Sequence, residues 1–316
     1  MKITITDAHT LNPGDLSWTP IKSFGDVDIY DRTPPELLKE RCAGANIILT
    51  NKVALSEDLI SEAKSLKLIC VTATGYNIVD VEAARKKGII VCNVPDYGTA
   101  SVAQHTIALI LELANRVGSN SASVSRGDWQ RSLDFCYTKG SLTELSGKTL
   151  GIIGFGKIGE KVALLATAFD MNVVYFSRSE KETPYARYVD LETLFATSDV
   201  ISLHCPLTKE NQQFVNRDLL SQVKPTAWLI NTSRGQLVDE QHLAEALNKG
   251  TLAAAALDVL SVEPPPASNP LLHAKNCVIT PHTAWMSREA RQRMMTVTRQ
   301  NIESFLNGNP IHVVSK

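Results

Sequence analysis

The sequence predicts an α/β protein with two Rossmann-like, doubly wound domains, each built on a parallel sheet. Short apolar runs alternate with helical patterns from one end of the chain to the other, and this is the pattern of such folds. Several of these runs are continuously apolar, which is typical of strands that helices cover on both faces. The length of 316 residues favours about two domains.

The first set of strands is expected in the N-terminal third of the chain. These strands span residues 2–6, 27–30, 46–50, 68–72 and 89–93. A helix is predicted over residues 81–87, with Asp80 as the residue that caps its N-terminus. The last helix, about residues 287–307, is expected to return to this part. We therefore expect a first domain with a flavodoxin-like sheet over residues 1–98 and 285–316.

The second set of strands is expected to form a second, Rossmann-like domain over residues 99–284. Its strands span residues 149–153, 172–176, 200–204, 227–231, 254–258 and 277–280. Helices are predicted between them, for example over residues 158–169 and 240–248.

The segment between the two sets begins with a helix over residues 101–117 (SVAQHTIALILELANRV) that is apolar on nearly every face. Such a helix does not lie on a surface. We expect it to be buried between domains or subunits, as a linker and as the interface of a homodimer. Residues 118–148, which include Trp129, Phe135 and Tyr137, are expected to be a long irregular loop with a functional or interface role.

Composition and charge exclude several classes of function. With 32 Lys+Arg against 33 Asp+Glu, the net charge of -1 argues against a general nucleic-acid binder. No apolar run approaches the roughly 20 residues that span a bilayer, and no secretory signal is visible, so a cytoplasmic protein without membrane contact is expected. No CxxC pair and no HExxH spacing occur, so we expect reduced thiols and no metal site.

Residues 149–159 (TLGIIGFGKIG) place a GxGxxG motif between a strand and a helix. Gly154 permits a tight turn, Gly156 allows a pyrophosphate to approach the backbone, and Gly159 allows close packing of the helix on the strand. The helix N-terminus supplies free N–H groups for the phosphates. The motif therefore predicts a dinucleotide site, whose expected contacts are Gly154, Phe155, Gly156, Lys157, Ile158 and Gly159.

The residues after the next strand bear on the choice of cofactor. NAD sites usually carry an acid there, whereas this chain has Ser177, Arg178 and Ser179. The serines can donate hydrogen bonds to a 2′-phosphate and Arg178 can pair with it, with Lys181 as a second nearby cation. NADP(H) is therefore the favoured cofactor. The alternative is NAD(H) bound without an acidic contact, with Arg178 a solvated surface residue.

Ligands of open α/β sheets bind beyond the carboxyl ends of the strands, so the residues that follow each strand are candidates for a site. Arg234, Glu263 and His282 follow the last three strands of the second set. A guanidinium can bind a substrate carboxylate at two points. An imidazolium can donate a proton as a hydride arrives, while a carboxylate on its other nitrogen holds its tautomer. His204 also follows a strand and is the rival base.

These residues resemble the D-isomer-specific 2-hydroxyacid dehydrogenase family, and within it the glycerate dehydrogenase or hydroxypyruvate reductase group. The matching motifs occur in order along nearly the whole chain. They are ATGYN (73–77) with Asp80, NVP (93–95), SV (101–102), the GxGxxG run, HCP (204–206), NTSRG (231–235), LVD (237–239), LDV (257–259), EP (263–264) and PH (281–282).

The resemblance implies roles for particular residues. Arg234 would bind the substrate carboxylate, His282 would be the acid/base, and Glu263 would be its partner. Asp258 would face the nicotinamide carboxamide. Backbone N–H groups around Thr74, Gly75 and Tyr76 would complete the carboxylate site from the other domain, in a cleft between the two. Further residues expected to contact the cofactor are Val102, His204, Pro206, Thr208, Thr232 and Asp258.

The expected activity is NAD(P)H-dependent reduction of a small 2-oxo acid, hydroxypyruvate or glyoxylate, to D-glycerate or glycolate. Two alternatives stay open: a reductase of bulkier acids of the phenylpyruvate type, and a non-enzymatic, dinucleotide-sensing protein resembling a corepressor. The intact Arg–Glu–His set favours an enzyme. Candidates for the substrate side-chain pocket, from this subunit or its partner, are Trp129, Phe135, Tyr137 and Trp285; the loop that carries the first three is equally consistent with ordinary dimer packing.

Overall fold

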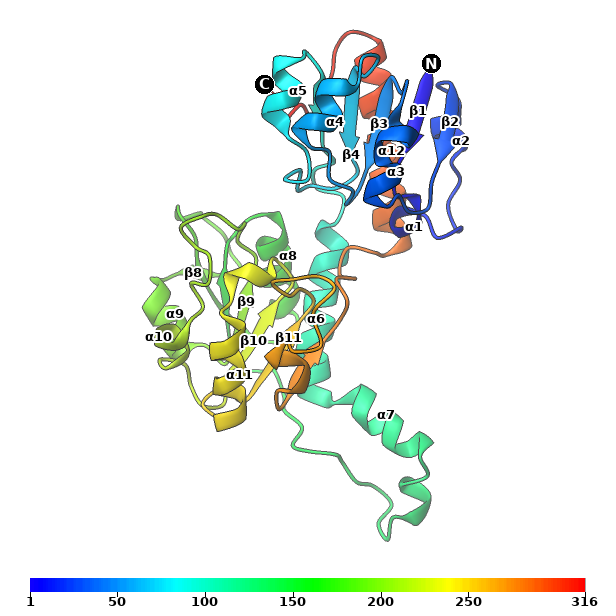
Figure 1. Cartoon of the computed structure of the whole chain (residues 1–316). Helices are drawn as coiled ribbons and strands as arrows, with labels where there is room; N and C mark the ends of the chain where they lie inside the picture. Colours follow the sequence, from blue (N-terminus) through cyan, green and yellow to red (C-terminus); the bar gives the residue numbers. More distant parts are fainter. Residues whose placement is uncertain (316) are drawn as a thin grey trace. The chain divides into compact units, whose positions relative to one another are not determined.

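The computed structural model describes residues 1–315, and the chain forms two compact units (Figure 1). Unit 1 consists of Met1–Gly98 and Met286–Lys316, and unit 2 consists of Thr99–Trp285. Trp285 thus belongs to unit 2, one residue away from the predicted boundary. Each unit is an α/β layer structure on a parallel sheet, which confirms the predicted fold class.

Unit 1 contains a five-stranded sheet in the order β2-β1-β3-β4-β5, the order of flavodoxin-like folds. Every pairing is parallel. The central strands β3 and β4 are fully buried and, apart from Thr50, apolar, as expected for strands covered on both faces. The strands are β1 (Lys2–Ile5), β2 (Asp26–Ile29), β3 (Ile47–Thr50), β4 (Leu68–Val71) and β5 (Ile90–Cys92).

The helices of unit 1 are α1 (Ala8–Leu11), α2 (Thr19–Lys22), α3 (Pro35–Cys42), α4 (Glu57–Glu62), α5 (Val81–Lys86) and α12 (Arg288–Leu306). Asp80 caps α5, since its carboxylate accepts the N–H of Ala83 at 2.9 Å. Helix α12 packs in this unit, where the buried Arg291 pairs with Asp15 at 2.7 Å.

Unit 2 contains a seven-stranded parallel sheet in the order β12-β11-β10-β9-β6-β7-β8. The strand order reverses between β6 and β9, which is where ligands bind in sheets of this kind. The strands are β6 (Thr149–Ile153), β7 (Asn172–Phe176), β8 (Arg187–Tyr188), β9 (Val200–Leu203), β10 (Trp228–Asn231), β11 (Ala254–Leu257) and β12 (Cys277–Ile279).

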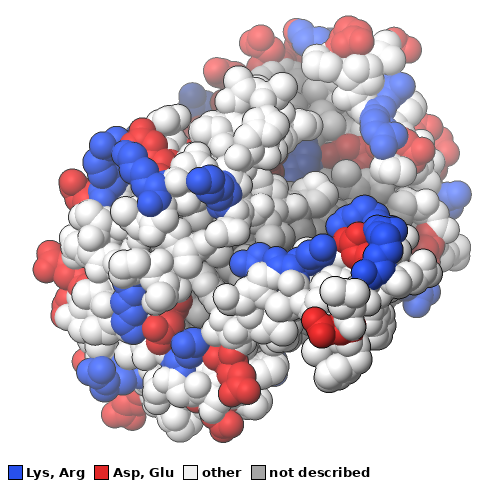
Figure 2. All heavy atoms as spheres, turned by 90° about the horizontal axis from the view of Figure 1, so that it is seen from below, with Lys and Arg blue, Asp and Glu red and all other residues white. Residues whose placement is uncertain are grey.

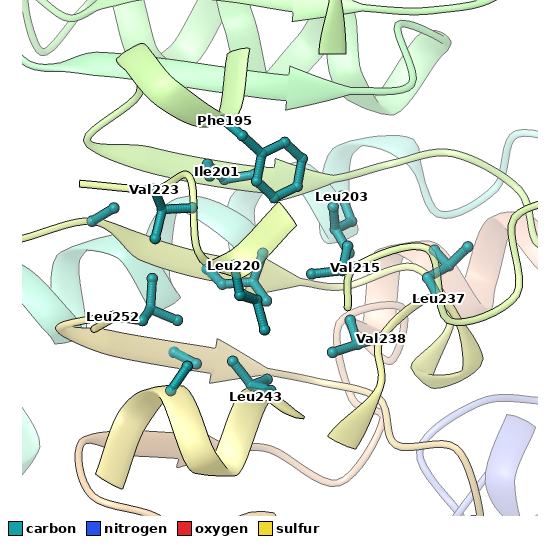
Figure 3. Close-up of a cluster of buried hydrophobic side chains, with 14 of the residues drawn as sticks. Phe195, Ile201, Leu203, Val215, Leu220, Val223, Leu237, Val238, Leu243 and Leu252 are labelled. Carbon is teal, nitrogen blue, oxygen red and sulfur yellow. The ribbon is translucent and has the colours of Figure 1, made fainter. Parts of the chain in front are cut away.

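One core cluster of unit 2 supports the segment that follows β10 (Figure 3). Ile201 and Leu203 of β9 lie in this cluster with Phe195, and Leu237 and Val238 belong to it as well. The helices of unit 2 are α6 (Thr99–Asn115), α7 (Val117–Ser125), α8 (Lys157–Thr167), α9 (Leu191–Thr197), α10 (Arg217–Leu220) and α11 (Glu240–Lys249), with short 3₁₀ turns η1 (Trp129–Arg131), η2 (Gly235–Leu237) and η3 (Pro270–His273).

The helix expected over residues 101–117 has the predicted length but lies two residues earlier, over Thr99–Asn115, and has a different environment. It ends at Asn115, because Arg116 adopts a left-handed conformation (φ 50°) and a separate helix, α7, follows. Ala103 and Ile110 of α6 pack in a core cluster with strands of the same unit. Burial of α6 within unit 2 therefore accounts for most of its apolar surface, and Ala100, Gln104 and Ala108 form an exposed stripe.

The prediction of an irregular loop over residues 118–148 is partly wrong, because α7 and η1 lie within it. The α7 sequence, VGSNSASVS, is rich in residues with low helix propensity, which explains why it escaped detection. Figure 1 shows α7 projecting from the sheet of its unit. Apolar side chains near it are exposed, including Phe135 at 89%.

Charged side chains of both signs are interspersed on the face shown in Figure 2, consistent with the net charge of -1. Among residues 1–315, no helix combines the length and hydropathy needed to cross a membrane. The six cysteines all fall in this range and carry free thiols: Cys42, Cys70, Cys92, Cys136, Cys205 and Cys277.

Candidate active site

The glycine run lies at the point where the strand order of unit 2 reverses. Gly154 has a φ of 94°, and a Cβ there would overlap the backbone of Cys205, which follows the neighbouring strand β9. A Cβ at Gly159 would overlap the carbonyl oxygen of Gly154. Both positions therefore require glycine for close backbone packing.

Gly156 differs from these two glycines, because a Cβ there would meet no atom within 4 Å. It precedes α8 as its N-cap residue and has no side chain with which to cap the first N–H groups of the helix. Free helix N–H groups beside such a gap fit the pyrophosphate of a dinucleotide. The predicted neighbours Phe155, Lys157 and Ile158 belong to the same turn and helix start.

Ser177, Arg178 and Ser179 form the turn after β7. The Arg178 side chain is exposed, and among the described residues it has no hydrogen-bonding or ionic partner. Lys181, predicted as a second cation for a phosphate, instead pairs with Glu160 of α8 at 2.8 Å. Arg178 is therefore the cation of this turn that is not neutralised by a neighbour.

Arg234 follows β10 in a rigid turn. The side chain of Asn231 donates to the Arg234 carbonyl at 2.8 Å and accepts the N–H of Ser233 at 3.0 Å. The Ser233 hydroxyl donates to the carbonyl of Cys205 at 2.6 Å. The Arg234 guanidinium donates to the carbonyl of Ser233 at 2.7 Å and is exposed to solvent. The backbone is thus fixed, while most donors of the guanidinium remain available to a ligand.

The next residue, Gly235, lets a second loop approach. We call residues 260–270 the strap. A Cβ at Gly235 would overlap the backbone of Leu260 at the start of the strap. Gln236 also donates to the carbonyl of Ser261 at 2.8 Å. The segment that carries Arg234 and the strap therefore lie in direct contact.

Glu240 of α11 accepts hydrogen bonds from two residues of the strap. One carboxylate oxygen accepts the N–H of Ser261 at 2.7 Å, and the other accepts the Ser261 hydroxyl and the Asn269 amide, both at 2.8 Å. Bonds to an ionised acceptor are stronger than neutral ones. Glu240 therefore restrains the loop in which Glu263 lies.

Glu263 of the strap contacts His282 directly. One carboxylate oxygen accepts the N–H of Leu260 at 3.0 Å, and the other lies 2.5 Å from Nδ1 of His282. The two side chains are 36% and 26% exposed. Among residues 1–315, no protein group lies within hydrogen-bonding distance of Nε2 of His282. This arrangement fixes the imidazole on one side and leaves its other nitrogen available to a reacting group.

The buried carboxylate of Asp258, 1% exposed, holds the turn that carries His282. It accepts the N–H groups of Thr283 and Ala284, both at 2.9 Å, and the Thr280 hydroxyl at 2.5 Å. Burial raises the pKa of Asp258, but the bonds from His105, Thr280 and these N–H groups outweigh it, so the pKa lies below 3.8. The predicted contact of Asp258 with the nicotinamide stays a prediction.

His204, the rival base, has a different environment. Its Nε2 lies 2.9 Å from the hydroxyl of Ser202, a neutral partner. Burial lowers its pKa to about 4, so it is uncharged near neutrality. This geometry favours His282 over His204 as the proton donor.

Arg234, Glu263 and His282 thus follow neighbouring strands, β10, β11 and β12, and lie at the carboxyl edge of one sheet.

The other residues predicted to contact the cofactor differ in how far they are buried. Val102 is buried on α6, Thr232 is buried with its hydroxyl 3.0 Å from that of Thr106, and Pro206 and Thr208 are exposed after β9.

Thr74, Gly75 and Tyr76 follow β4 in unit 1, at the carboxyl edge of its sheet. The Thr74 hydroxyl donates to the carbonyl of Val94 at 3.0 Å, and the Asn93 side chain donates to the Thr74 carbonyl at 2.8 Å. Their contact with a substrate stays a prediction.

Among the described residues, no cluster of three His, Cys, Asp or Glu side chains has the arrangement of a metal site.

The chain resembles known proteins over its full length. Residues 107–284 match the profile of the NAD binding domain of D-isomer specific 2-hydroxyacid dehydrogenases. The chain belongs to the D-isomer-specific 2-hydroxyacid dehydrogenase family. It is 44% identical to a hydroxypyruvate reductase of Blautia hydrogenotrophica over 100% of both chains. It is 41% identical to a glycerate dehydrogenase of Methylorubrum extorquens over 90% of both chains.

A solved structure, an acyclic imino acid reductase in complex with NADPH and D-arginine, superposes with a TM-score of 0.87 at 33% identity. It covers 99% of this chain and 100% of its own. As a D-2-hydroxyacid dehydrogenase, this protein is an oxidoreductase, and its glycine run lies within the matched NAD-binding domain. The alternative of a non-enzymatic protein resembling a corepressor is therefore not supported.

Proposed function

We propose that this protein reduces a small 2-oxo acid to the corresponding D-2-hydroxy acid, with hydroxypyruvate and glyoxylate as substrates. The products are D-glycerate and glycolate. The observation that carries this proposal is the Glu263–His282 pair at the same sheet edge as the exposed Arg234. The names of the two relatives, hydroxypyruvate reductase and glycerate dehydrogenase, support substrates of this size.

Each residue has a defined part in this reaction. A bound nicotinamide dinucleotide supplies the hydride that reduces the carbonyl carbon. Arg234 binds the substrate carboxylate through two parallel hydrogen bonds. His282 donates the proton on Nε2 to the carbonyl oxygen, so that the ketone becomes a hydroxyl group. Glu263 stabilises the imidazolium through Nδ1 and fixes the plane of the ring.

The residues that hold the dinucleotide follow from the glycine run. The N–H groups at the start of α8 bind the pyrophosphate in the space left by Gly156. We propose that NADP(H) is preferred over NAD(H). Arg178 is exposed and has no partner among residues 1–315, and Ser177 and Ser179 occupy positions where an acidic residue would repel a 2′-phosphate. NADPH in the related imino acid reductase supports this preference.

The test is a panel of 2-oxo acids assayed with NADPH and with NADH, with the stereochemistry of each product assigned. The proposal expects the highest kcat/KM for hydroxypyruvate or glyoxylate, a D-configured glycerate, and a preference for NADPH. Preferential reduction of phenylpyruvate would contradict the proposal that the substrate is a small 2-oxo acid. A clear preference for NADH would contradict the proposed preference for NADP(H).

We propose that two copies associate through the exposed stripe of α6, which consists of Ala100, Gln104 and Ala108. The alanines at both ends of the stripe, Ala100 and Ala108, are small side chains two helical turns apart, and small residues let two helices approach closely. Sedimentation velocity should find a dimer for the native chain and a monomer for Ala108→Glu. A dimer unaffected by Ala108→Glu would place the interface elsewhere.

A further inference from the structure

Tyr175 of β7 is a tyrosine with no solvent exposure. Its ring stacks on Phe155, with ring centroids 4.0 Å apart and an angle of 22° between the planes. Tyr188 of β8 packs edgewise against it at 5.5 Å. A phenylalanine would satisfy all of these contacts. The buried hydroxyl group therefore needs an explanation of its own, because a buried polar group is costly unless it is hydrogen-bonded.

Both partners of the Tyr175 hydroxyl belong to the backbone of Lys181. The hydroxyl accepts the N–H of Lys181 at 2.7 Å and donates to the carbonyl of Lys181, also at 2.7 Å. The chain thus leaves β7, turns over residues 177–180 and is bound back to β7 by one side chain. The Ser177 hydroxyl donates to the carbonyl of Ser179 at 2.5 Å and tightens the same turn.

The closed turn presents donors outward. Arg178 is exposed at its centre and has no partner within the described part of the chain. In that same part, no acceptor meets the backbone N–H groups of Arg178 and Ser179. Lys181 is bound to Glu160 of α8 at 2.8 Å, which ties the end of the turn to the helix that starts at the glycine run. A guanidinium beside free N–H groups is a donor set for a phosphate monoester.

We propose that Tyr175 is a positioning residue for recognition of a 2′-phosphorylated adenosine. It does not touch the ligand. Its hydroxyl fixes the turn over residues 177–181 in the conformation that offers Arg178 and its neighbouring N–H groups to the 2′-phosphate. This inference rests on the proposed preference for NADP(H) and adds a residue that holds the phosphate-binding turn in its conformation.

Tyr175→Phe separates this role from packing. The substitution keeps the ring and its stack on Phe155, and it leaves the N–H and the carbonyl of Lys181 unbound. A mobile turn must then be ordered when the phosphate binds, so affinity for the 2′-phosphate falls by about tenfold. Other residues bind the rest of the nucleotide, so the affinity for that part should not change.

The experiment is isothermal titration calorimetry of the full chain with adenosine 2′,5′-bisphosphate and with adenosine 5′-monophosphate. The native chain should bind the bisphosphate more tightly. Tyr175→Phe should lose most of that difference with an unchanged Kd for the monophosphate. Tyr188→Phe is the matched control, because its ring packs on Tyr175 without a hydrogen bond from its hydroxyl among the described residues; it should leave both Kd values unchanged.

The outcomes distinguish this inference from the proposed cofactor preference. If the native chain does not prefer the bisphosphate, the NADP(H) preference is wrong and the inference falls with it. If both the native chain and Tyr175→Phe prefer the bisphosphate equally, the inference alone is wrong. Should Tyr175→Phe fail to fold, hydrogen exchange in the native chain decides: slow exchange of the Lys181 amide without ligand supports the closed turn, and exchange as fast as at Arg178 refutes it.

Discussion

The carboxylate of Glu263 lies 2.5 Å from the imidazole nitrogen Nδ1 of His282. The two residues reach this contact from loops after neighbouring strands, β11 and β12. Each loop is held separately: Glu240 binds the strap that carries Glu263, and Asp258 binds the turn that carries His282. The contact is therefore enforced from both sides by residues that do not themselves join the pair.

Glu263→Gln should lower kcat by about 10²–10⁴-fold, the range typical of general acid–base groups. The amide keeps the size of the side chain but loses the charge that stabilises the imidazolium. Steady-state kinetics with hydroxypyruvate measures the effect, and the Kd for the nucleotide should not change. A variant with native kcat would mean that the pair has a structural role only.

Arg234→Ala should lower kcat/KM for every 2-oxo acid by about 10- to 100-fold or more, since a charge-assisted hydrogen bond contributes about 1.5–3 kcal/mol. Arg234→Lys should recover only part of this loss, because an ammonium cannot make two parallel bonds to a carboxylate. The comparison uses several 2-oxo acids with different side chains. A loss confined to one of them would show that Arg234 contacts the side chain instead of the carboxylate.

Two glycines of the GxGxxG run should respond to alanine in opposite ways. Gly156→Ala places a methyl group in open space, so thermal unfolding should be unchanged while nucleotide binding weakens. Gly159→Ala drives a methyl group into the carbonyl of Gly154 and should lower the free energy of unfolding by about 1–3 kcal/mol. Unfolding midpoints and nucleotide titrations distinguish the two. Native nucleotide binding by Gly156→Ala would argue against a pyrophosphate there.

His204 predicts a pH dependence of stability. Burial lowers its pKa from 6.5 to about 4, so between these values the unfolded chain binds a proton that the folded chain does not. The free energy of unfolding is therefore not reduced by His204 above pH 6.5, and it falls as the pH decreases from 6.5 toward 4. The lowered pKa of Asp258 lies below 3.8, outside this window.

The measurement is the Tm of the native chain and of His204→Asn at pH 7 and at pH 5. The native chain should lose more of its Tm on acidification than the variant does. Equal losses would show that His204 does not titrate in this way.

Sequence reasoning locates Arg234, Glu263 and His282 because parallel strands end at one edge of a sheet, so that residues after successive strands become neighbours. The glycine spacing is similarly informative, since the overlaps at Gly154 and Gly159 follow from backbone geometry that only glycine permits.

Other features depend on contacts that leave no local pattern. In the sequence, Glu240 is typical of the first turn of a helix. No neighbouring residue indicates its hydrogen bond with Ser261, which lies 21 residues later. Gly235 follows Arg234 in the family motif, yet only the fold shows that Leu260 requires it. The α7 helix escaped prediction because its serines and glycine have weak helix propensity.

The most direct test of the account is the kcat for NADPH-dependent reduction of hydroxypyruvate by His282→Ala, with the nucleotide Kd measured in parallel. The account predicts a kcat lower by about 10²–10⁴-fold and an unchanged Kd, since His282 supplies the proton and does not hold the nucleotide. A His282→Ala protein that reduces hydroxypyruvate at the native rate would contradict it.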